Sequence, residues 1–373
     1  MLDVILISAP TVFSQTSISI AQQLTYHSNS FFNYKQLPDL NDYTGLTFSH
    51  IFESEKIQSR IYYQGDLNWF RTYTDRLYHN HALGYDGYSI SRDEKKAIYF
   101  GLNLSWYEYQ DQYSLYNSRW FEGYTNMMIY FLPDLIGRFG YILYKKSYSE
   151  LPEFNYWEHY FFAQLNTYFQ TGTSLTALLN YGLKDYIPMQ TSEGRGRRAT
   201  IDYFEMPGVD QLVSSIKVAQ SLGMKTSLSL KYLYRMNPGL APGSAMTMDS
   251  DELLTENELF DDRYGYSGHE LSVTFTHFLR GHVKTELGVS RLWKNYQNRQ
   301  IFDLEGNISL LSDSRTDTRA VIWANFSRSF GVNWGVKRIK ISLEGGYWKN
   351  NSNDLYYQFD NYFGSLGLEF KLK

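Results

Sequence analysis

Apolar and polar side chains alternate with a period of two along most of the chain. In the segment 57–69 the odd positions, from Ile57 to Trp69, are mostly apolar, while even positions such as Arg60 and Asp66 are polar. The same alternation recurs at 98–107, 175–184, 225–235, 339–344 and 365–372. Successive side chains of a β-strand point to opposite faces, so each segment predicts a strand with one apolar and one hydrophilic face.

The alternation predicts about sixteen strands, each about 10–14 residues long. Their expected ranges are 17–28, 42–53, 57–70, 76–90, 97–109, 118–132, 137–148, 156–170, 174–185, 209–222, 224–236, 267–280, 282–294, 318–329, 337–350 and 359–373. Strands of soluble proteins are usually about 5–6 residues long, whereas a tilted membrane-spanning strand needs about 9–11. The length therefore favours strands that cross a membrane.

The connections between these segments alternate in length. Short ones fall at 54–56, 91–96, 133–136, 171–173, 223 and 281, and longer ones at 29–41, 110–117, 186–208, 237–266, 295–317 and 351–358. Tight periplasmic turns and longer extracellular loops produce this alternation in an up-and-down barrel. Lipid offers no hydrogen-bond partners, so an open sheet edge is excluded. The predicted fold is all-β, a closed antiparallel up-and-down transmembrane β-barrel.

The start of the chain differs from the rest. Residues 1–15 hold a short apolar run followed by Ser14 and Gln15, which is typical of the end of a secretory signal peptide, although no cationic segment precedes it. The alternative is a first strand of a cytoplasmic protein. We therefore expect a signal-peptide remnant at 1–15 and one barrel domain at 16–373, with long extracellular loops at 186–208, 237–266 and 295–317.

The composition excludes several classes of protein. The 373 residues include no Cys, which rules out a disulfide scaffold and a thiolate metal site. Lys and Arg number 35 and Asp and Glu 39, a near balance that gives no reason to expect a nucleic-acid partner. Aromatic residues make up 18 % of the chain, and many fall at strand ends, among them Trp106, Trp157 and Trp293. Such rings prefer the membrane interface, although aromatics also favour strands in general.

Taken together, these strands and connections resemble bacterial outer-membrane β-barrels of the porin-like general class. The resemblance covers residues 16–373 and lies in the architecture, without a diagnostic motif. It implies a location in the bacterial outer membrane, contact with outer-membrane lipid, and a water-filled lumen that conducts small polar solutes.

The hydrophilic faces of the predicted strands supply the candidate pore-lining residues. They carry both signs of charge, with a modest excess of cations. The candidates are Arg60, Asp66, Lys184, Lys217, Lys225, Lys231, Arg235, Glu270, Arg280, Lys284, Glu286, Arg319, Lys340, Glu344 and Glu369. An excess of cations favours anions in a pore, whereas a mixed lumen with cross-strand ion pairs has little preference; both interpretations remain open.

Three further motifs are candidate binding sites. His79 and His81 share one strand face and could begin a zinc site, but interfacial histidines are the simpler interpretation. The carboxylates of 249–262 could bind Ca²⁺, but the spacing is not that of an EF-hand, and a solvated acidic loop is favoured. This loop could instead pair across the mouth with the basic segment of 193–198, which holds Arg195, Arg197 and Arg198.

The sequence predicts a passive channel rather than an enzyme. It contains no nucleophile elbow, P-loop, dinucleotide fingerprint or His-Glu-x-x-His motif, so we expect no catalytic residues, cofactor or metal. Two alternatives remain within the membrane: a non-conducting barrel that anchors or binds a partner, and an outer-membrane lipase or protease. A secreted β-propeller is a third. A homo-oligomer or a protein partner is compatible with all of them.

Overall fold

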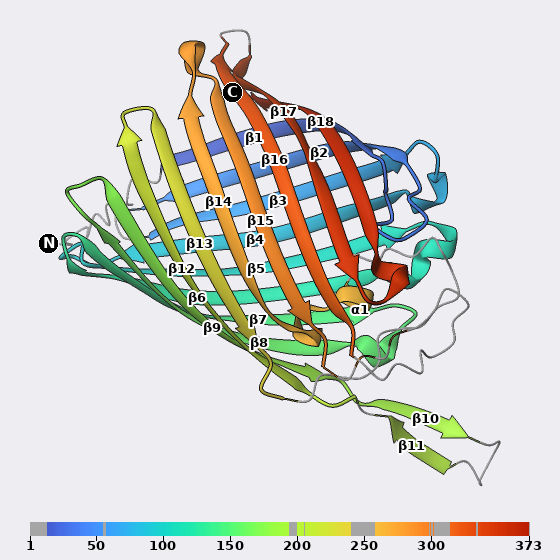
Figure 1. Cartoon of the computed structure of the whole chain (residues 1–373). Helices are drawn as coiled ribbons and strands as arrows, with labels where there is room; N and C mark the ends of the chain where they lie inside the picture. The colour runs from blue at the N-terminus through green and yellow to red at the C-terminus, as the bar shows by residue number, and fades with distance from the viewer. Residues whose placement is uncertain are drawn as a thin grey trace, which may run out of the picture.

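Sixteen antiparallel strands close into one barrel, as the period-two pattern predicts (Figure 1). The computed structural model describes residues 13–54, 57–193, 200–204, 206–239, 258–297, 299, 301, 314–332 and 335–372. Around the barrel each strand pairs with its neighbours in the chain, and β1 pairs with β18 to complete the ring. Two further short strands, β10 and β11, form a separate hairpin.

The strands that form the barrel are long and of similar length. They are β1 (Phe13–His27), β2 (Asp39–Glu53), β3 (Ile57–Phe70), β4 (Tyr78–Ile90), β5 (Lys96–Tyr109), β6 (Ser118–Leu132), β7 (Leu135–Tyr148), β8 (Tyr156–Tyr168), β9 (Thr173–Tyr186), β12 (Val209–Gly223), β13 (Thr226–Met236), β14 (Ser267–Phe278), β15 (Lys284–Asn295), β16 (Thr316–Gly331), β17 (Val336–Ser352) and β18 (Phe359–Leu372). The hairpin consists of β10 (Met189–Glu193) and β11 (Thr200–Phe204).

The helical elements are all short, and they lie in the connections. They are η1 (Thr74–Arg76), η2 (Asp111–Tyr116), η3 (Pro152–Phe154), α1 (Glu258–Asp261), η5 (Arg263–Gly265), η6 (Arg280–His282) and η7 (Leu355–Tyr357). Among the described residues, no helix has the length and apolar character needed to cross a membrane.

Long and short connections emerge at opposite ends of the barrel. The short ones follow β2, β4, β6, β8, β12, β14 and β16, and we call their end the turn end. The longer connections define the loop end, where the hairpin of β10 and β11 extends away from the barrel (Figure 1). Strand β1 begins at the turn end with Phe13 opposite Glu53, within the range expected for a signal peptide. The signal peptide itself stays a prediction, because residues 1–12 lie outside the described residues.

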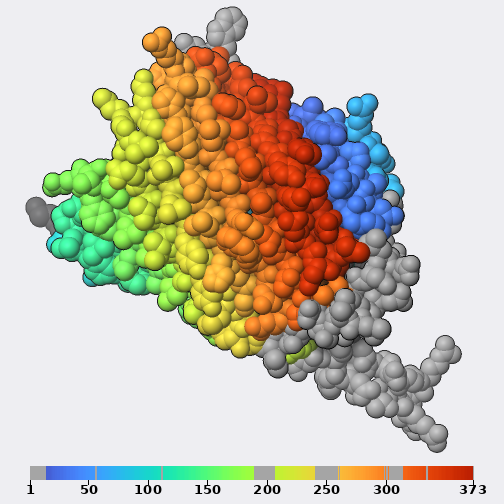
Figure 2. Space-filling view, in the orientation of Figure 1, coloured from blue at the N-terminus to red at the C-terminus, as the bar shows by residue number. Residues whose placement is uncertain are grey.

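The outer face of the barrel is apolar and exposed. Ile322 and Leu343 keep 58 % and 56 % of their surface accessible, and Leu102 keeps 53 %. An unbroken outer wall runs over β13–β18 in Figure 2. Apolar surface of this extent is stable in lipid, and ring closure leaves no strand edge unpaired there. The chain is therefore a transmembrane β-barrel whose buried side chains lie inside and at the loop end.

Candidate pore and the segment that crosses it

The strand registers place the hydrophilic faces inside the barrel. Inward residues occupy the rows that alternate with exposed apolar residues such as Leu102 and Ile322. All but two of the candidate pore-lining residues lie on inward rows of strands: Arg60, Asp66, Lys184, Lys217, Lys231, Arg235, Glu270, Lys284, Glu286, Arg319, Lys340, Glu344 and Glu369. The other two, Lys225 and Arg280, lie in turn-end connections rather than on strands.

Several inward charges form ion pairs with one another. Arg60 pairs with Asp86 on β4, and Tyr124 Oη donates to the same carboxylate at 3.0 Å. Lys284 Nζ lies 2.8 Å from Glu286 Oε1, both on β15. Pairs of this kind neutralise part of the cation excess read from the sequence. The interior is thus mixed in charge, with local cation surplus where a lysine has no carboxylate beside it.

A segment from the longest described connection, the one between β13 and β14, folds inward against the wall. We call residues 258–265, which comprise α1 and η5, the inner segment. Three of its consecutive residues reach charged partners on different strands. Asp262 Oδ2 lies 2.5 Å from Lys184 Nζ on β9, Arg263 pairs with Glu158 on β8, and Asp261 Oδ2 lies 2.5 Å from Lys294 Nζ on β15 and 3.8 Å from Arg319 Nη2 on β16. These strands lie on both sides of β13 and β14 in the ring, so the inner segment is held from two directions.

Asp261 is the most enclosed charge of the inner segment. Its side chain is 8 % exposed, and Lys294 beside it is 3 % exposed. Burial alone raises the pKa of the Asp261 carboxyl, but the nearby cations Lys294, Arg315 and Arg319 outweigh it and hold that pKa well below its usual range. The Tyr296 hydroxyl also donates to this carboxylate. Asp261 is therefore ionised at neutral pH and fixed in place by charge.

The second half of the inner segment is fixed by Tyr264 and Arg263. Tyr264 is 2 % exposed, and its Oη donates to Glu158 Oε1 at 2.7 Å. The ring fits because Gly182 lies beneath it: a Cβ on that glycine would come within 2.1 Å of Tyr264 Oη. Burial lowers the pKa of Arg263, but Glu158 beside it dominates and raises that pKa above its ordinary value. The inner segment thus matches the wall in shape and in charge.

The first half of the inner segment joins an aromatic cluster at the loop end. Leu259 packs with Phe31 from the β1–β2 connection, Tyr113 and Tyr116 from η2, and Tyr148 at the end of β7, and all five are at most 5 % exposed. In the ring, β13 and β14 lie on the side opposite β3 and β4, which the β1–β2 and β5–β6 connections flank. The inner segment therefore crosses the loop end of the barrel from one wall toward the other.

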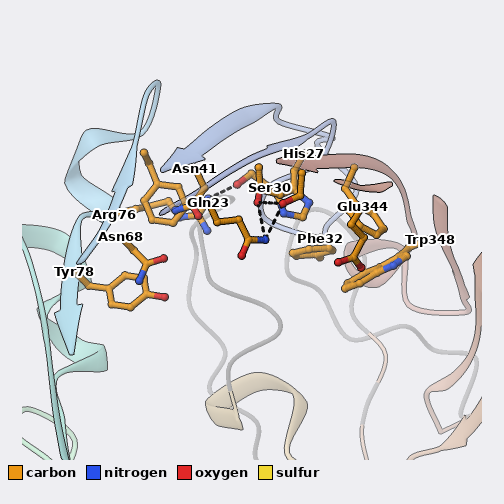
Figure 3. Close-up of a pocket in the computed structure, with 14 residues that line it drawn as sticks. Gln23, His27, Ser30, Phe32, Asn41, Asn68, Arg76, Tyr78, Glu344 and Trp348 are labelled. Carbon is orange, nitrogen blue, oxygen red and sulfur yellow. Dashed lines mark hydrogen bonds between the residues drawn. The ribbon is translucent and has the colours of Figure 1, made fainter. Parts of the chain in front are cut away.

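Two separate cavities lie in the described interior, and one of them is lined in part by the inner segment. One of about 360 Å³ is lined by Glu122, Glu158, Lys184 and residues 261–264. Another, of about 350 Å³, lies at the β1–β18 side, where Arg76, Asn68 and Tyr78 stand on one flank and Glu344 and Trp348 on the other (Figure 3). Both are polar and aromatic in lining. Both are candidate spaces for a small polar solute.

The structure corrects the interpretation of 249–262 as a solvated acidic loop. At the end of that loop, Asp261 and Asp262 are held by cations of the wall, with 8 % and 20 % of their side chains exposed. Residues 249–257 of that loop, and Arg195, Arg197 and Arg198, lie outside the described residues, so pairing between these loops stays a hypothesis. No sequence signal distinguishes Asp261 and Asp262 from the other carboxylates of the loop.

His79 and His81 lie away from the pore. His79 and His81 are on the outer face of β4 with ring centroids 5.0 Å apart, and Tyr63 Oη lies 2.7 Å from His81 Nδ1. Among the described residues, no group of three or more His, Asp or Glu side chains is placed to hold a metal ion. The interfacial interpretation of this motif fits the observed position.

Comparison with known proteins shows similarity in structure alone. No family model matches the chain, and no curated protein matches it in sequence. Acinetobacter baumannii OccAB1 superposes with a TM-score of 0.56 at 10 % identity, over 96 % of both chains. Pseudomonas aeruginosa OpdQ gives 0.52 at 11 % identity, over 96 % of this chain and 98 % of that one, and Pseudomonas aeruginosa OprD gives 0.51 at 10 % identity, over 96 % and 95 %. The chain thus has the fold of porin-like β-barrels of the bacterial outer membrane.

Proposed function

We propose that the protein is a porin-like channel that lets small polar solutes diffuse passively across the outer membrane. The inner segment is its constriction. A sixteen-stranded barrel is wide enough to leave an aqueous lumen, and its inward rows here are hydrophilic and charged along their length. The observation that carries the proposal is the inner segment itself, which narrows the lumen with paired charges of both signs.

The charged pairs suit a filter for polar solutes. Lys184 and Asp262, like Arg263 and Glu158, present opposite charges side by side at the wall of the cavity beneath. A transverse arrangement of charge orients dipolar solutes and excludes apolar ones, because apolar molecules cannot replace the water that solvates such groups. Solute size is then limited by the space that the inner segment leaves on either side.

A second candidate, a closed barrel that binds a partner, is favoured by one observation. The cluster of Leu259 with Phe31 and Tyr113 joins connections from opposite walls, and its side chains are almost fully buried. In that case the loops at 186–208 and 295–317 supply the binding surface, and the barrel anchors it. A homo-oligomer is compatible with either function and stays a prediction.

Conductance of the refolded protein in a planar lipid bilayer separates the two candidates. Insertion is first checked by the heat-dependent mobility shift of a folded barrel on an SDS gel. A channel gives stepwise increases in current, and the step should grow when Lys184→Gln and Arg263→Gln release the inner segment. The matched control is Lys96→Gln, which removes one cation from the turn end of β5.

The outcomes point in different directions. Stepwise current in the native protein, with larger steps in the released variant, supports the constricted channel. If the native protein conducts no current and only the variant with the released inner segment conducts, a closed barrel is supported. If both the native protein and the released variant fold and insert but conduct no current, the channel function is overturned.

A further inference from the structure

Two clusters of the same composition lie on the outer face near the loop end. Each contains one Arg, one Lys, one His and one Trp. The β6–β8 cluster consists of Arg119, Lys145, Trp157 and His159, and the β14–β17 cluster of His269, Arg291, Trp293 and Lys349. Because β6–β8 and β14–β17 are separated by several strands in both directions around the ring, the clusters occupy distinct sectors of the wall (Figure 1).

The registers fix the outward direction of these residues. Lys145 pairs across strands with Phe121 and Trp157, in the outer row that also holds Leu104, which is 53 % exposed. Arg291 and Lys349 both stand opposite Ala320, one on each side of it. Arg291 and Lys349 therefore stand at one level of the wall, on either side of the small Ala320 side chain.

Within each cluster the side chains are arranged alike. Lys145 Nζ lies 5.0 Å from the ring centroid of Trp157, and Arg291 Cζ lies 5.2 Å from that of Trp293. Each histidine is held through Nδ1 by a tyrosine hydroxyl, from Tyr141 at 2.7 Å for His159 and from Tyr232 at 2.6 Å for His269. Each cluster thus combines a cation over a Trp ring with a histidine that is held by a tyrosine.

The cations of both clusters lack carboxylate partners. None of Arg119, Lys145, Arg291 and Lys349 forms an ion pair within the described part of the chain, whereas the interior charges at the inner segment are paired. The nearest acids on the outer rows are Glu108, diagonal to Arg119 across β5 and β6, Asp185, opposite Trp157, and Asp360, opposite Lys349, and none of them forms an ion pair with these cations in the described part of the chain. Asp360 accepts a hydrogen bond from Tyr347 Oη at 2.6 Å. Positive charge therefore remains available on the outer surface.

We propose that the two clusters bind phosphate groups on the headgroups of lipids that surround the loop end. Trp side chains mark the level of the membrane–water interface, where headgroup phosphates lie. Guanidinium and ammonium groups are the side chains that bind phosphate oxygens, and histidine adds a further donor. The ligand is a phosphorylated lipid rather than free phosphate, because the sites open onto the apolar wall that acyl chains cover. The proposal is independent of whether the barrel conducts.

Native mass spectrometry of the detergent-solubilised full chain tests the proposal. The protein is titrated with bis-phosphorylated lipid A and, separately, with the same lipid after phosphate removal. Each basic residue near a membrane surface contributes about a fivefold gain in affinity for anionic lipid, so a pair contributes about thirtyfold. We expect two tightly retained lipids for the phosphorylated form and neither for the dephosphorylated form.

Variants assign the lipids to the clusters. Arg119→Gln with Lys145→Gln should remove one retained lipid, and Arg291→Gln with Lys349→Gln the other, each with a loss of affinity of about thirtyfold. The control, Lys217→Gln with Lys231→Gln, removes two inward cations and should leave both lipids bound. Heat-dependent gel mobility verifies that each variant is folded, and the single changes Lys145→Gln and Lys349→Gln serve if a double variant is not. Equal retention of the dephosphorylated lipid, or equal loss in the control, overturns the proposal.

Discussion

Lys217 on β12 and Lys231 on β13 stand directly opposite each other in the strand register, and both face the barrel interior. Thr176 on one side and Ser272 on the other are their next neighbours in the same row, so no carboxylate stands directly beside them, and the nearest, Glu270, is diagonal to Lys231. Like charges opposed across a strand pair are destabilising unless water or counter-ions screen them. The pair therefore marks a point in the lumen where the potential is positive.

Replacing this pair should change ion selectivity. In Lys217→Gln/Lys231→Gln we expect the preference for chloride over potassium to fall by about twofold in roughly 0.1 M salt, since the Debye length there is about 10 Å. The reversal potential across a bilayer in a KCl gradient measures it. At about 1 M salt the Debye length shortens to about 3 Å, and the difference should shrink.

The control for this experiment is Lys145→Gln, a lysine on the outer face of β7. It removes the same kind of charge from the wall without changing the lumen. An equal shift in reversal potential in the control would remove the argument that Lys217 and Lys231 set selectivity.

The Asp261→Asn variant should release the inner segment. The change removes the Asp261 carboxylate that faces Lys294 and Arg319, and breaking a buried ion pair costs about 3–5 kcal/mol. About 3 kcal/mol shifts the equilibrium between docked and released segment by about a hundredfold. We expect larger and noisier single-channel currents. An unchanged current would show that the segment does not limit the pore.

The contact between the inner segment and the barrel wall should be insensitive to mild acid. Asp261 has a lowered pKa in the fold, so its stabilising effect is complete above the ordinary carboxyl pKa of about 4 and is lost only as pH falls through its lower folded value. Conductance measured from pH 7 to about pH 4 should therefore show no step that depends on Asp261. A transition in this range that disappears in Asp261→Asn contradicts the prediction.

A methyl group at Gly182 should displace Tyr264. The Cβ of Gly182→Ala would lie 2.1 Å from Tyr264 Oη, and overpacking of this kind typically costs about 1–3 kcal/mol. We expect increased conductance that Tyr264→Phe in the same chain partly reverses, because removing the hydroxyl removes the closest contact. The Tyr264→Phe variant by itself controls for the lost hydrogen bond to Glu158.

Cysteine labelling should report the position of Leu259. The chain has no Cys, so a single introduced thiol is the one reactive site. In Leu259→Cys the side chain sits in a cluster where Leu259 is 5 % exposed, and a water-soluble maleimide should react slowly. Lys217→Cys on the exposed inner wall should react fast, and adding Asp261→Asn should accelerate the reaction at position 259. Equal rates at both positions would place Leu259 outside the cluster.

Much of the fold could be predicted from the sequence because each strand spans the membrane. With one face in lipid and the other in water, alternation persists over the whole strand, as in Ile57–Phe70, where exposed Ile61 and inward Arg60 are adjacent. The ends of the strands were predicted less accurately. Strands β16 and β17 run longer than predicted, to Gly331 and Ser352. The added residues extend β16 at the turn end and β17 at the loop end. At these ends the alternation of apolar and polar residues is weaker.

The inner segment could not be predicted from the sequence. Asp262 reaches Lys184 across 78 residues, and Arg263 reaches Glu158 across 105, contacts that exist only because the barrel closes. In the sequence, Asp261 and Asp262 are two of many carboxylates in an acidic loop. Ring closure decides which of them meet wall cations, and no local spacing encodes that.

The barrel closes only when β1 pairs with β18, so both strands must be present before closure. Gln23 Nε2 donates to Ser365 Oγ at 2.7 Å although the residues are 342 positions apart, and the second edge of β1 is paired by β18 over Ser19–His27. Contacts of such separation form slowly, because the entropy of closing the chain is spent before they stabilise anything. The two strands farthest apart among the described barrel strands, β1 and β18, are thus partners. A chain arrested before Phe359 keeps an open edge on β1, and in lipid that edge has no alternative partner.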